Sequence, residues 1–287
     1  MLSQKILLNL RAFAFHPLAY STTTNPANEV FIERLTGKDE GITILNMNRP
    51  AKKNSLGRVF MDQFREVLDE LKYDPKTRVV ILNSKCDNVF CSGADLKERK
   101  TMSQQEATRF VNGLRDSFTD VERLPQPVIA AIDGFALGGG LELALACDIR
   151  VASQKAKMGL VETKWALIPG AGGSQRLYRI VGVAKAKELI YTAEVLNGAD
   201  AAKLGVVNHV VEANPIEKSL EIARKIIPRG PIAVKLAKLA INLGSQTDIT
   251  SALSVEQQCY AQIVHSKDRL EGMAAFAEKR DPIYKGE

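Results

Sequence analysis

Hydrophobic and polar positions along the chain predict strands and helices that alternate up to about residue 215. Segments with one apolar face predict helices over 55–71 and 103–124, and a shorter apolar segment predicts another over 140–147. Runs rich in β-branched residues predict a hairpin from 29–35 and 41–47, and buried strands at 78–83, 128–132 and 149–153. This alternation indicates an α/β fold with a largely buried sheet.

The pattern changes near residue 216, where the strand signals stop and helical patterns follow over 216–227, 232–243 and 253–264. These helices carry more apolar surface than a peripheral layer covers alone, so we expect part of it to be buried between copies of the chain. The apolar positions are Ile216, Ile222, Ile226, Ile232, Val234, Leu236, Leu239 and Ile241. We therefore predict a core over 29–215 and a helical oligomerisation region over 216–287.

The first 28 residues differ from the rest of the chain. They contain Lys5 and Arg11, several Ser and Thr, and no acidic residue before Glu29. Their leucines and phenylalanines fit one face of a helix, which is typical of a mitochondrial transit peptide. A secretory signal is the alternative, but Asn9 and Arg11 would interrupt its apolar region. We expect residues 1–28 to be a transit peptide that is cleaved before Glu29.

Composition and charge exclude several classes of protein. The net charge is +6, and it falls to +4 when the first 28 residues are removed, which is too mild for a dedicated nucleic-acid binder. No run approaches eighteen apolar residues, so no membrane span is expected. The four cysteines form no Cys-x-x-Cys pair and only three histidines are present, so we expect no metal site. The cysteines are typical of buried thiols in a reducing compartment.

Two glutamates, Glu142 and Glu162, stand out in apolar sequence beside glycine-rich or tight-turn segments. A carboxylate buried in such surroundings costs considerable free energy unless it faces a wet pocket. Two carboxyl groups that face one water molecule can add that water or remove it by general acid–base chemistry. The pair is therefore the candidate catalytic centre.

Two glycine-bearing segments, Ser92–Lys97 and Gly138–Gly140, each follow a predicted strand and precede a predicted helix. Small residues there allow a ligand to approach the backbone, and the first N–H groups of a helix lack internal acceptors. One backbone N–H from each segment would form an oxyanion hole. The alternative is that both are only tight turns. Neither matches a P-loop or a Rossmann fingerprint.

Taken together, these motifs resemble the enoyl-CoA hydratase (crotonase) family. The resemblance runs from about residue 29 to the C-terminus. Its main motifs are Asn48–Pro50, Ser92–Lys97, Ile129–Ile149, Pro169–Leu177 and Ala201–Val207. Within the family, Met158–Thr163 and Lys267–Met273 are most similar to the mitochondrial AU-binding 3-methylglutaconyl-CoA hydratases and the enoyl-CoA hydratase domain-containing proteins.

The resemblance implies a fold, an assembly and a set of roles. The fold would be a spiral of ββα turns with a helical C-terminal trimerisation region, assembled as a trimer or a dimer of trimers. The backbone N–H groups of Ala94 and Gly139 would bind the thioester oxygen. Glu142 would orient and activate water, and Glu162 would donate a proton to C2. The implied coenzyme A contacts are Lys53, Ala94, Asp95, Leu96, Lys97, Gly139 and, from a C-terminal tail of a neighbouring subunit, Phe276, Lys279 and Lys285.

The implied activity is hydration of a 2-enoyl-CoA in mitochondrial fatty-acid or branched-chain amino-acid breakdown, with no cofactor besides the coenzyme A of the substrate. The alternative is a 3-methylglutaconyl-CoA hydratase of leucine degradation that also binds AU-rich RNA. Lys97, Arg99 and Lys100 begin a basic helix, but Glu98 and Glu106 interrupt the charge, which favours a solvated face over an RNA site.

A catalytically idle scaffold is a third possibility, which the intact glutamate pair argues against. The sequence does not fix the acyl group. A distal carboxylate on the substrate would need a basic partner in the acyl pocket, and the sequence does not place that partner.

Overall fold

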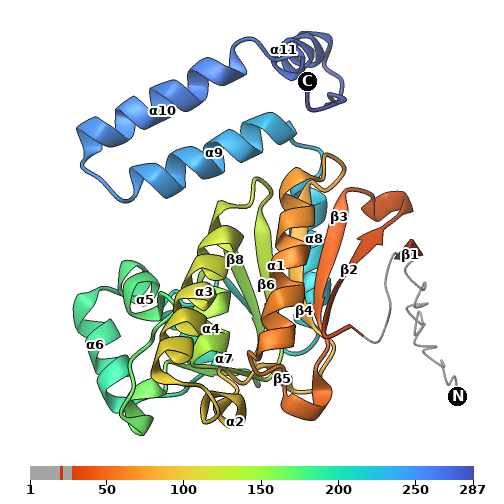
Figure 1. The fold of residues 1–287 in the computed structure, drawn as a ribbon. Coiled ribbons are helices and arrows are strands. Elements are labelled where there is room, and N and C mark those ends of the chain that lie inside the picture. Colours follow the sequence, from red (N-terminus) through yellow and green to blue (C-terminus); the bar gives the residue numbers. More distant parts are fainter. Residues whose placement is uncertain (1–19, 22–27) are drawn as a thin grey trace, which may run out of the picture.

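The computed structural model describes residues 20–21 and 28–287, and most of the predicted transit peptide lies outside them. Two sheets form the centre of the molecule (Figure 1). The larger sheet has the order β1 (Tyr20–Ser21), β2 (Val30–Leu35), β3 (Ile42–Met47), β4 (Val79–Ser84), β6 (Val128–Ile132), β8 (Ile149–Ser153) and β11 (His209–Val211). The smaller sheet has the order β10 (Leu196–Asn197), β9 (Lys157–Gly159), β7 (Phe135–Leu137) and β5 (Val89–Cys91).

Successive turns of the chain contribute one strand to each sheet. After the antiparallel hairpin of β2 and β3, the strands β4, β6, β8 and β11 run parallel to one another in the larger sheet. Between them, β5, β7 and β9 run parallel in the smaller sheet, and β10 closes its edge in the antiparallel direction. A helix follows β5 and β7 before the chain returns, so the chain forms the expected spiral of ββα turns.

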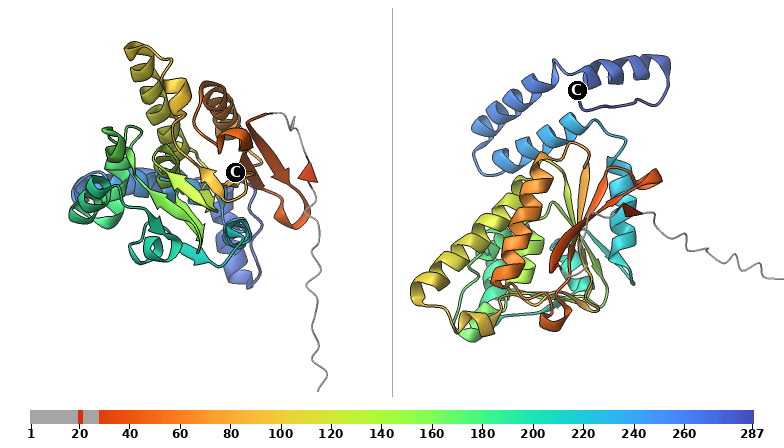
Figure 2. Two further views of the ribbon diagram at one scale, coloured as in Figure 1. Left: turned by 90° about the horizontal axis from the view of Figure 1, so that it is seen from below. Right: turned by 45° about the vertical axis from the view of Figure 1, so that its right-hand side comes forward.

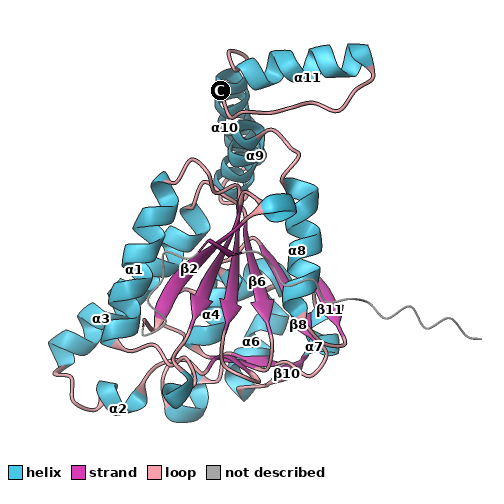
Figure 3. Ribbon diagram, turned by 90° about the vertical axis from the view of Figure 1, so that its right-hand side faces the viewer, coloured by secondary structure: helices cyan, strands magenta, loops and turns pink. Residues whose placement is uncertain are grey.

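Both faces of the larger sheet are buried. In β4, Val80 and Leu82 belong to the main core, whereas Val79 and Ile81 face a second core cluster on the opposite side. Helices α1 (Arg58–Tyr73) and α3 (Gln104–Arg123) lie on one side of the sheet, and α8 (Pro215–Ile226) lies on the other (Figure 3). Burial on both faces explains why the central strands are continuous apolar runs rather than alternating ones.

Helix α8 covers the sheet with Leu220 and Ala223, and Ile216, Ile222 and Ile226 pack against the same cluster. The helical region predicted from residue 216 therefore begins with a helix that belongs to the core of this chain. Its remaining part is α9 (Pro231–Gly244), α10 (Ile249–Ile263) and α11 (Lys267–Glu278), which stand away from the sheets (Figure 2).

The helices that complete the fold are short and surround the glycine-bearing segments. They are α2 (Leu96–Arg99), α4 (Gly139–Leu145), α5 (Gly173–Val181), α6 (Val183–Thr192) and α7 (Gly198–Lys203), with 3-10 turns η1 (Gly37–Asp39), η2 (Pro50–Lys52) and η3 (Glu162–Trp165). In the described part of the chain, no helix is both long and apolar enough to cross a membrane.

Candidate active site

The two glycine-bearing segments predicted to form an oxyanion hole are brought side by side by the pairing of β5 with β7. Gly93 has φ +91°, and a β-carbon there would lie 2.7 Å from the carbonyl oxygen of Leu137 and 3.5 Å from the nitrogen of Gly139. Only glycine fits such a close approach of two backbones. Gly139 is the first residue of α4, so its N–H has no acceptor within the helix.

The amides of Ala94 and Gly139 are both available to a ligand. Within residues 20–21 and 28–287, neither donates a hydrogen bond, although the flanking amides of Asp95 and Gly138 do. Two unused donors from adjacent segments, one at the positive end of a helix, can stabilise a negative charge that develops on a thioester oxygen.

Glu142 projects from α4 and is held by the loop that precedes α5. Its Oε1 accepts hydrogen bonds from the backbone N–H groups of Ala171 and Gly173, each at 2.8 Å. The side chain is buried, and burial raises its pKa, against the lowering effect of these two bonds and of nearby arginines. The other oxygen, Oε2, has no hydrogen-bond partner among the described residues and would lie 3.9 Å from a β-carbon at Gly139.

Glu162 begins η3 and faces the same glycine turn from the other side. A β-carbon at Gly138 would lie 3.0 Å from its Oε1, and Gly138 itself has φ +52°. Its Oε2 is enclosed and has no hydrogen-bond partner in the described chain. Burial and the charge of Glu142 raise the pKa of Glu162 to about 7. The structure thus brings the two predicted carboxyl groups together in different surroundings: Glu142 accepts two backbone hydrogen bonds, and Oε2 of Glu162 accepts none among the described residues.

The predicted coenzyme A segment is stabilised by the side chain of Asp95. Its Oδ1 caps α2 by accepting from the N–H groups of Lys97 and Glu98, and its Oδ2 lies 3.1 Å from Arg49. Burial alone would raise the pKa of Asp95, but these hydrogen bonds and the charge of Arg49 lower it. The carboxylate of Asp95 is therefore used within the protein, and the predicted contact of Ala94–Lys97 with coenzyme A would be made by other groups of this segment.

The other predicted coenzyme A contacts separate into two groups. Lys53 lies beside the site, since its carbonyl accepts from the N–H of Ser92. The second group, Phe276, Lys279 and Lys285, belongs to α11 and the C-terminal tail. These elements lie at the opposite end of the molecule from α2 and α4 (Figure 1). They can reach coenzyme A only in another subunit, as the sequence analysis expected, and their role stays a prediction.

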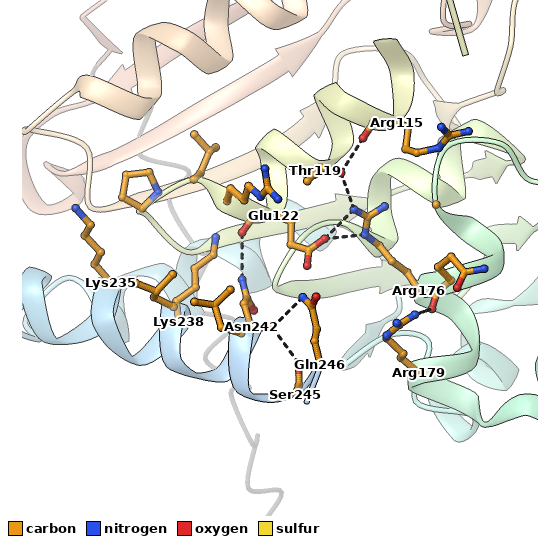
Figure 4. A pocket seen from close by; sticks show the side chains of 17 residues that line it. Arg115, Thr119, Glu122, Arg176, Arg179, Lys235, Lys238, Asn242, Ser245 and Gln246 are labelled. Atoms are coloured by element: carbon orange, nitrogen blue, oxygen red, sulfur yellow. Dashed lines mark hydrogen bonds and ion pairs between the residues drawn. The ribbon is translucent and has the colours of Figure 1, made fainter. Parts of the chain in front are cut away.

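A basic groove of about 460 Å³ lies between α3, α5 and α9 (Figure 4), and the residues that line it do not include Gly138–Gly140. Its arginines support the active-site loop: Arg176 lies 2.7 Å from Glu122 and donates to the carbonyl of Ala171, and Arg115 donates to the carbonyl of Gly170. Sequence reasoning missed this support, because Arg115 and Arg176 are distant in sequence from Glu142.

Two further observations bear on the chemistry. In the described part of the chain, no group of three or more His, Cys, Asp or Glu is placed to hold a metal ion. The free thiols of Cys91 and Cys147 are buried, and burial raises the pKa of each to about 12, so they are poor nucleophiles.

This fold, together with two carboxyl groups beside the amides of Ala94 and Gly139, defines the class of crotonase-fold acyl-CoA enzymes. Comparison with known proteins agrees, since residues 37–287 match the sequence profile of the enoyl-CoA hydratase/isomerase family. The chain belongs to this family, as its motifs predicted, and is an enzyme of the hydro-lyase type.

Relatives and solved structures agree with this assignment. Methylglutaconyl-CoA hydratase, mitochondrial, from Rattus norvegicus is 50% identical over 93% of this chain and 87% of that protein. Enoyl-CoA hydratase domain-containing protein 2, mitochondrial, from Mus musculus is 51% identical over 93% and 92%. The crystal structure of an enoyl-CoA hydratase from Bacillus anthracis superposes with a TM-score of 0.87 at 46% identity, covering 91% of this chain and all of that one. The predicted fold is therefore confirmed.

Proposed function

We propose that this chain is an enoyl-CoA hydratase of the mitochondrial matrix, which adds water across the 2,3 double bond of a 2-enoyl-CoA to give a 3-hydroxyacyl-CoA. The observation that carries the proposal is the pair Glu142 and Glu162, which flank one glycine turn in different environments. Two carboxyl groups in different surroundings are suited to act as base and acid in one reaction.

The geometry suggests how the residues divide the work. The thioester oxygen accepts hydrogen bonds from Ala94 and Gly139, and negative charge grows on it as water attacks C3. A donor aimed at that charge contributes about 3–4 kcal/mol. Glu142, held by two backbone N–H groups, accepts a proton from the attacking water through its free oxygen. Glu162, whose pKa of about 7 keeps much of it protonated, delivers a proton to C2.

Every atom of this reaction comes from the substrate and water, so the mechanism needs no metal or redox cofactor, and coenzyme A enters only as part of the substrate. The mitochondrial relatives, together with the acid-free start of the chain, support a mitochondrial location. Fatty-acid and branched-chain amino-acid breakdown are the processes there that produce 2-enoyl-CoA esters.

A homotrimer or a dimer of trimers fits the exposed apolar surface of the C-terminal helices. Among the described residues, Phe276 is 88% exposed, and Ile241, Ile249, Leu270 and Met273 are also exposed. Apolar surface of this extent is unusual on a monomer and typical of an interface. In such an assembly the tail of one subunit would reach the coenzyme A site of another.

The alternative is a 3-methylglutaconyl-CoA hydratase with AU-rich RNA binding, which the identity to methylglutaconyl-CoA hydratases supports equally. A specific RNA complex would lose affinity steeply as salt is raised, and a flat salt dependence in a filter-binding titration would exclude that part of the alternative.

The direct test of hydratase activity uses a purified chain of residues 29–287 with crotonyl-CoA. We expect the absorbance of the enoyl thioester to fall as 3-hydroxybutyryl-CoA forms. The Glu142→Gln/Glu162→Gln double variant, purified in parallel, controls for contaminating activity. A folded protein that hydrates none of the short 2-enoyl-CoA esters contradicts the proposal.

A further inference from the structure

Arg99, the last residue of α2, carries a partly buried guanidinium group. Its Nε is enclosed, and in the part of the chain that the structure describes the guanidinium makes no hydrogen bond and no ion pair. Arg49 is the contrasting case, since it forms ion pairs with Glu29, Asp95 and Glu98. Leaving a partly buried guanidinium unpaired is unfavourable, so a protein that keeps one there has a use for its unmet donors.

The guanidinium lies close enough to Glu142 for the two charges to interact. It sits over the ring of Phe110 in α3, 5.8 Å from the ring centroid. Burial lowers the pKa of Arg99, and the one acid whose charge acts to stabilise the cation is Glu142. The next residue of α3, Val111, meets Gly170, which immediately precedes the loop that holds Glu142.

Arg99 does not serve simply as the partner of Glu142. The two groups are not within ion-pair distance, and one oxygen of Glu142 is already held by Ala171 and Gly173. The Arg99 guanidinium thus interacts electrostatically with Glu142 but is too far from it to form an ion pair. Its N–H donors can therefore bind a second anion.

We propose that Arg99 binds a carboxylate at the far end of the acyl chain, so that the enzyme selects 2-enoyl-CoA esters that end in a carboxylate. This inference rests on the proposed hydratase function. With the thioester at Ala94 and Gly139 and C3 at the glutamates, the acyl chain continues beyond C3, and a carboxylate at C5 is two bonds further along. The planar fork of a guanidinium matches a carboxylate in two parallel hydrogen bonds, and the Phe110 ring fixes its plane.

Such a contact also solves an electrostatic problem. A substrate carboxylate beside Glu142 and Glu162 would be a third negative charge in a poorly solvated site. A cation placed between them offsets that repulsion, which is why discrimination at this position should be large. A site that hydrogen-bonds a substrate group strongly rejects an analogue that lacks this group, because the buried polar groups of the site are then left unpaired. An apolar pocket rejects an analogue with an added polar group much less strongly.

The test compares two substrates of equal chain length, glutaconyl-CoA and trans-2-pentenoyl-CoA, which differ by a carboxylate in place of the terminal methyl group. We expect the unmodified enzyme to favour glutaconyl-CoA in kcat/KM by about a hundredfold or more. Arg99→Gln should lower kcat/KM for glutaconyl-CoA by a similar factor, mainly by raising KM. The same substitution should change kcat/KM for pentenoyl-CoA by less than about threefold. Arg99→Lys should recover part of the loss. The matched control Lys100→Gln removes an exposed neighbouring charge and should leave both values unchanged.

Two kinetic results would overturn the proposal. If Arg99→Gln lowers kcat/KM equally for both substrates, Arg99 acts through Glu142 and not on the substrate. If the unmodified enzyme prefers pentenoyl-CoA, its acyl pocket holds no carboxylate site.

A binding measurement separates this inference from the hydratase proposal. Calorimetry with the saturated esters glutaryl-CoA and valeryl-CoA needs neither turnover nor a variant, and the unmodified protein should bind glutaryl-CoA at least about tenfold more tightly. If pentenoyl-CoA is hydrated but the two saturated esters bind equally, the carboxylate site is wrong and the function stands. If glutaryl-CoA binds preferentially but neither enoyl ester is hydrated, the site stands and the function is wrong.

Discussion

At the scale of single residues, the chemistry depends on two carboxyl groups of the same kind in different surroundings. Glu142 accepts two backbone hydrogen bonds that favour its ionised form, whereas Oε2 of Glu162 is enclosed without a donor. Burial raises the pKa of both, but Glu162 also faces the charge of Glu142. In the proposed mechanism these surroundings make Glu142 the base and Glu162 the acid, a division that the residue types alone do not provide.

The raised pKa of Glu162 has a consequence for stability. Its folded pKa of about 7 lies above its usual value of 4.5, so the folded state binds the proton more tightly than the unfolded state. Below pH 4.5 Glu162 is protonated in both states and does not lower the free energy of unfolding. As the pH rises from 4.5 to about 7, the free energy of unfolding falls progressively. Glu162→Gln mimics the protonated acid. Its melting temperature should therefore be higher than that of the unmodified protein at pH 8 and equal to it near pH 4.

Differential scanning fluorimetry of both proteins across that pH range checks this prediction. Glu188→Gln, an exposed glutamate on α6, is the control and should show no such pH-dependent difference. Equal melting temperatures of Glu162→Gln and the unmodified protein at pH 8 would mean that Glu162 ionises in the folded state as freely as it does in water.

Sequence reasoning found the glutamate pair because both acids interrupt apolar, glycine-bearing segments. It did not find Arg99, because three basic residues within four positions look like a solvated helix face. Only the packing of α2 against α3 separates the enclosed guanidinium of Arg99 from its exposed neighbours Lys97 and Lys100.

At the scale of elements, the long helices and the strands of the larger sheet could be predicted, because each spans enough residues to show a period. The smaller sheet was not predicted, since its strands are two or three residues long and carry almost no alternation. This sheet nevertheless aligns the segments of Ala94 and Gly139, so the site depends on the elements that are hardest to predict.

The start of α1 shows a different kind of failure. The sequence pattern predicts a helix from residue 55, where Ser55 is a suitable capping residue, but α1 begins at Arg58 after Gly57. The hydroxyl of Ser55 contacts Arg49 and Asp95, so a tertiary network takes the group that would have capped the helix.

The start of α3 does follow its sequence signal. Ser103 accepts from the N–H of Glu106, whose side chain accepts from the N–H of Ser103, and the two bonds form a capping box. Ser103→Ala should lower the free energy of unfolding by about 1 kcal/mol. Urea denaturation measures the change, and Thr108→Ala, one turn further into the same helix, should have a smaller effect. A loss no larger than that of Thr108→Ala would show that the box contributes little.

At the scale of the whole molecule, a closed sheet core carries a helical extension that is only partly covered. Residues 231–278 form α9, α10 and α11, and α9 and α10 pack mainly on each other while leaving apolar side chains exposed. The chain therefore folds around its own core but leaves apolar side chains of these helices exposed. In the proposed assembly a second copy of the chain covers them.

Truncation after Asn242 removes α10 and α11 together with the tail. We expect it to convert the oligomer into smaller species and to raise KM for the CoA ester, because both the interface and the tail contacts are lost. Light scattering and steady-state kinetics measure the two effects. A shorter truncation after Glu278 removes residues 279–287, which include Lys279 and Lys285, and should raise KM without changing the assembly. A soluble protein truncated after Asn242 that keeps its size and its KM contradicts both parts.

The composition of the first 28 residues predicts where the protein is found. Residues 1–28 fused to a fluorescent reporter should direct it into mitochondria, with cleavage before Glu29, because the segment is basic and contains no acid. Lys5→Glu/Arg11→Glu in the same fusion is the control and should abolish import. A reporter with the unmodified segment that stays in the cytosol rules out the transit peptide.

The most direct test of the central claim is the turnover of Glu142→Gln and Glu162→Gln with crotonyl-CoA. Each substitution should lower kcat by at least about a hundredfold, the usual effect of a lost acid or base, while coenzyme A binds as before. The double variant should lose less than the product of the two factors, because the pair acts as one unit. Near-normal turnover of either single variant would contradict the mechanism.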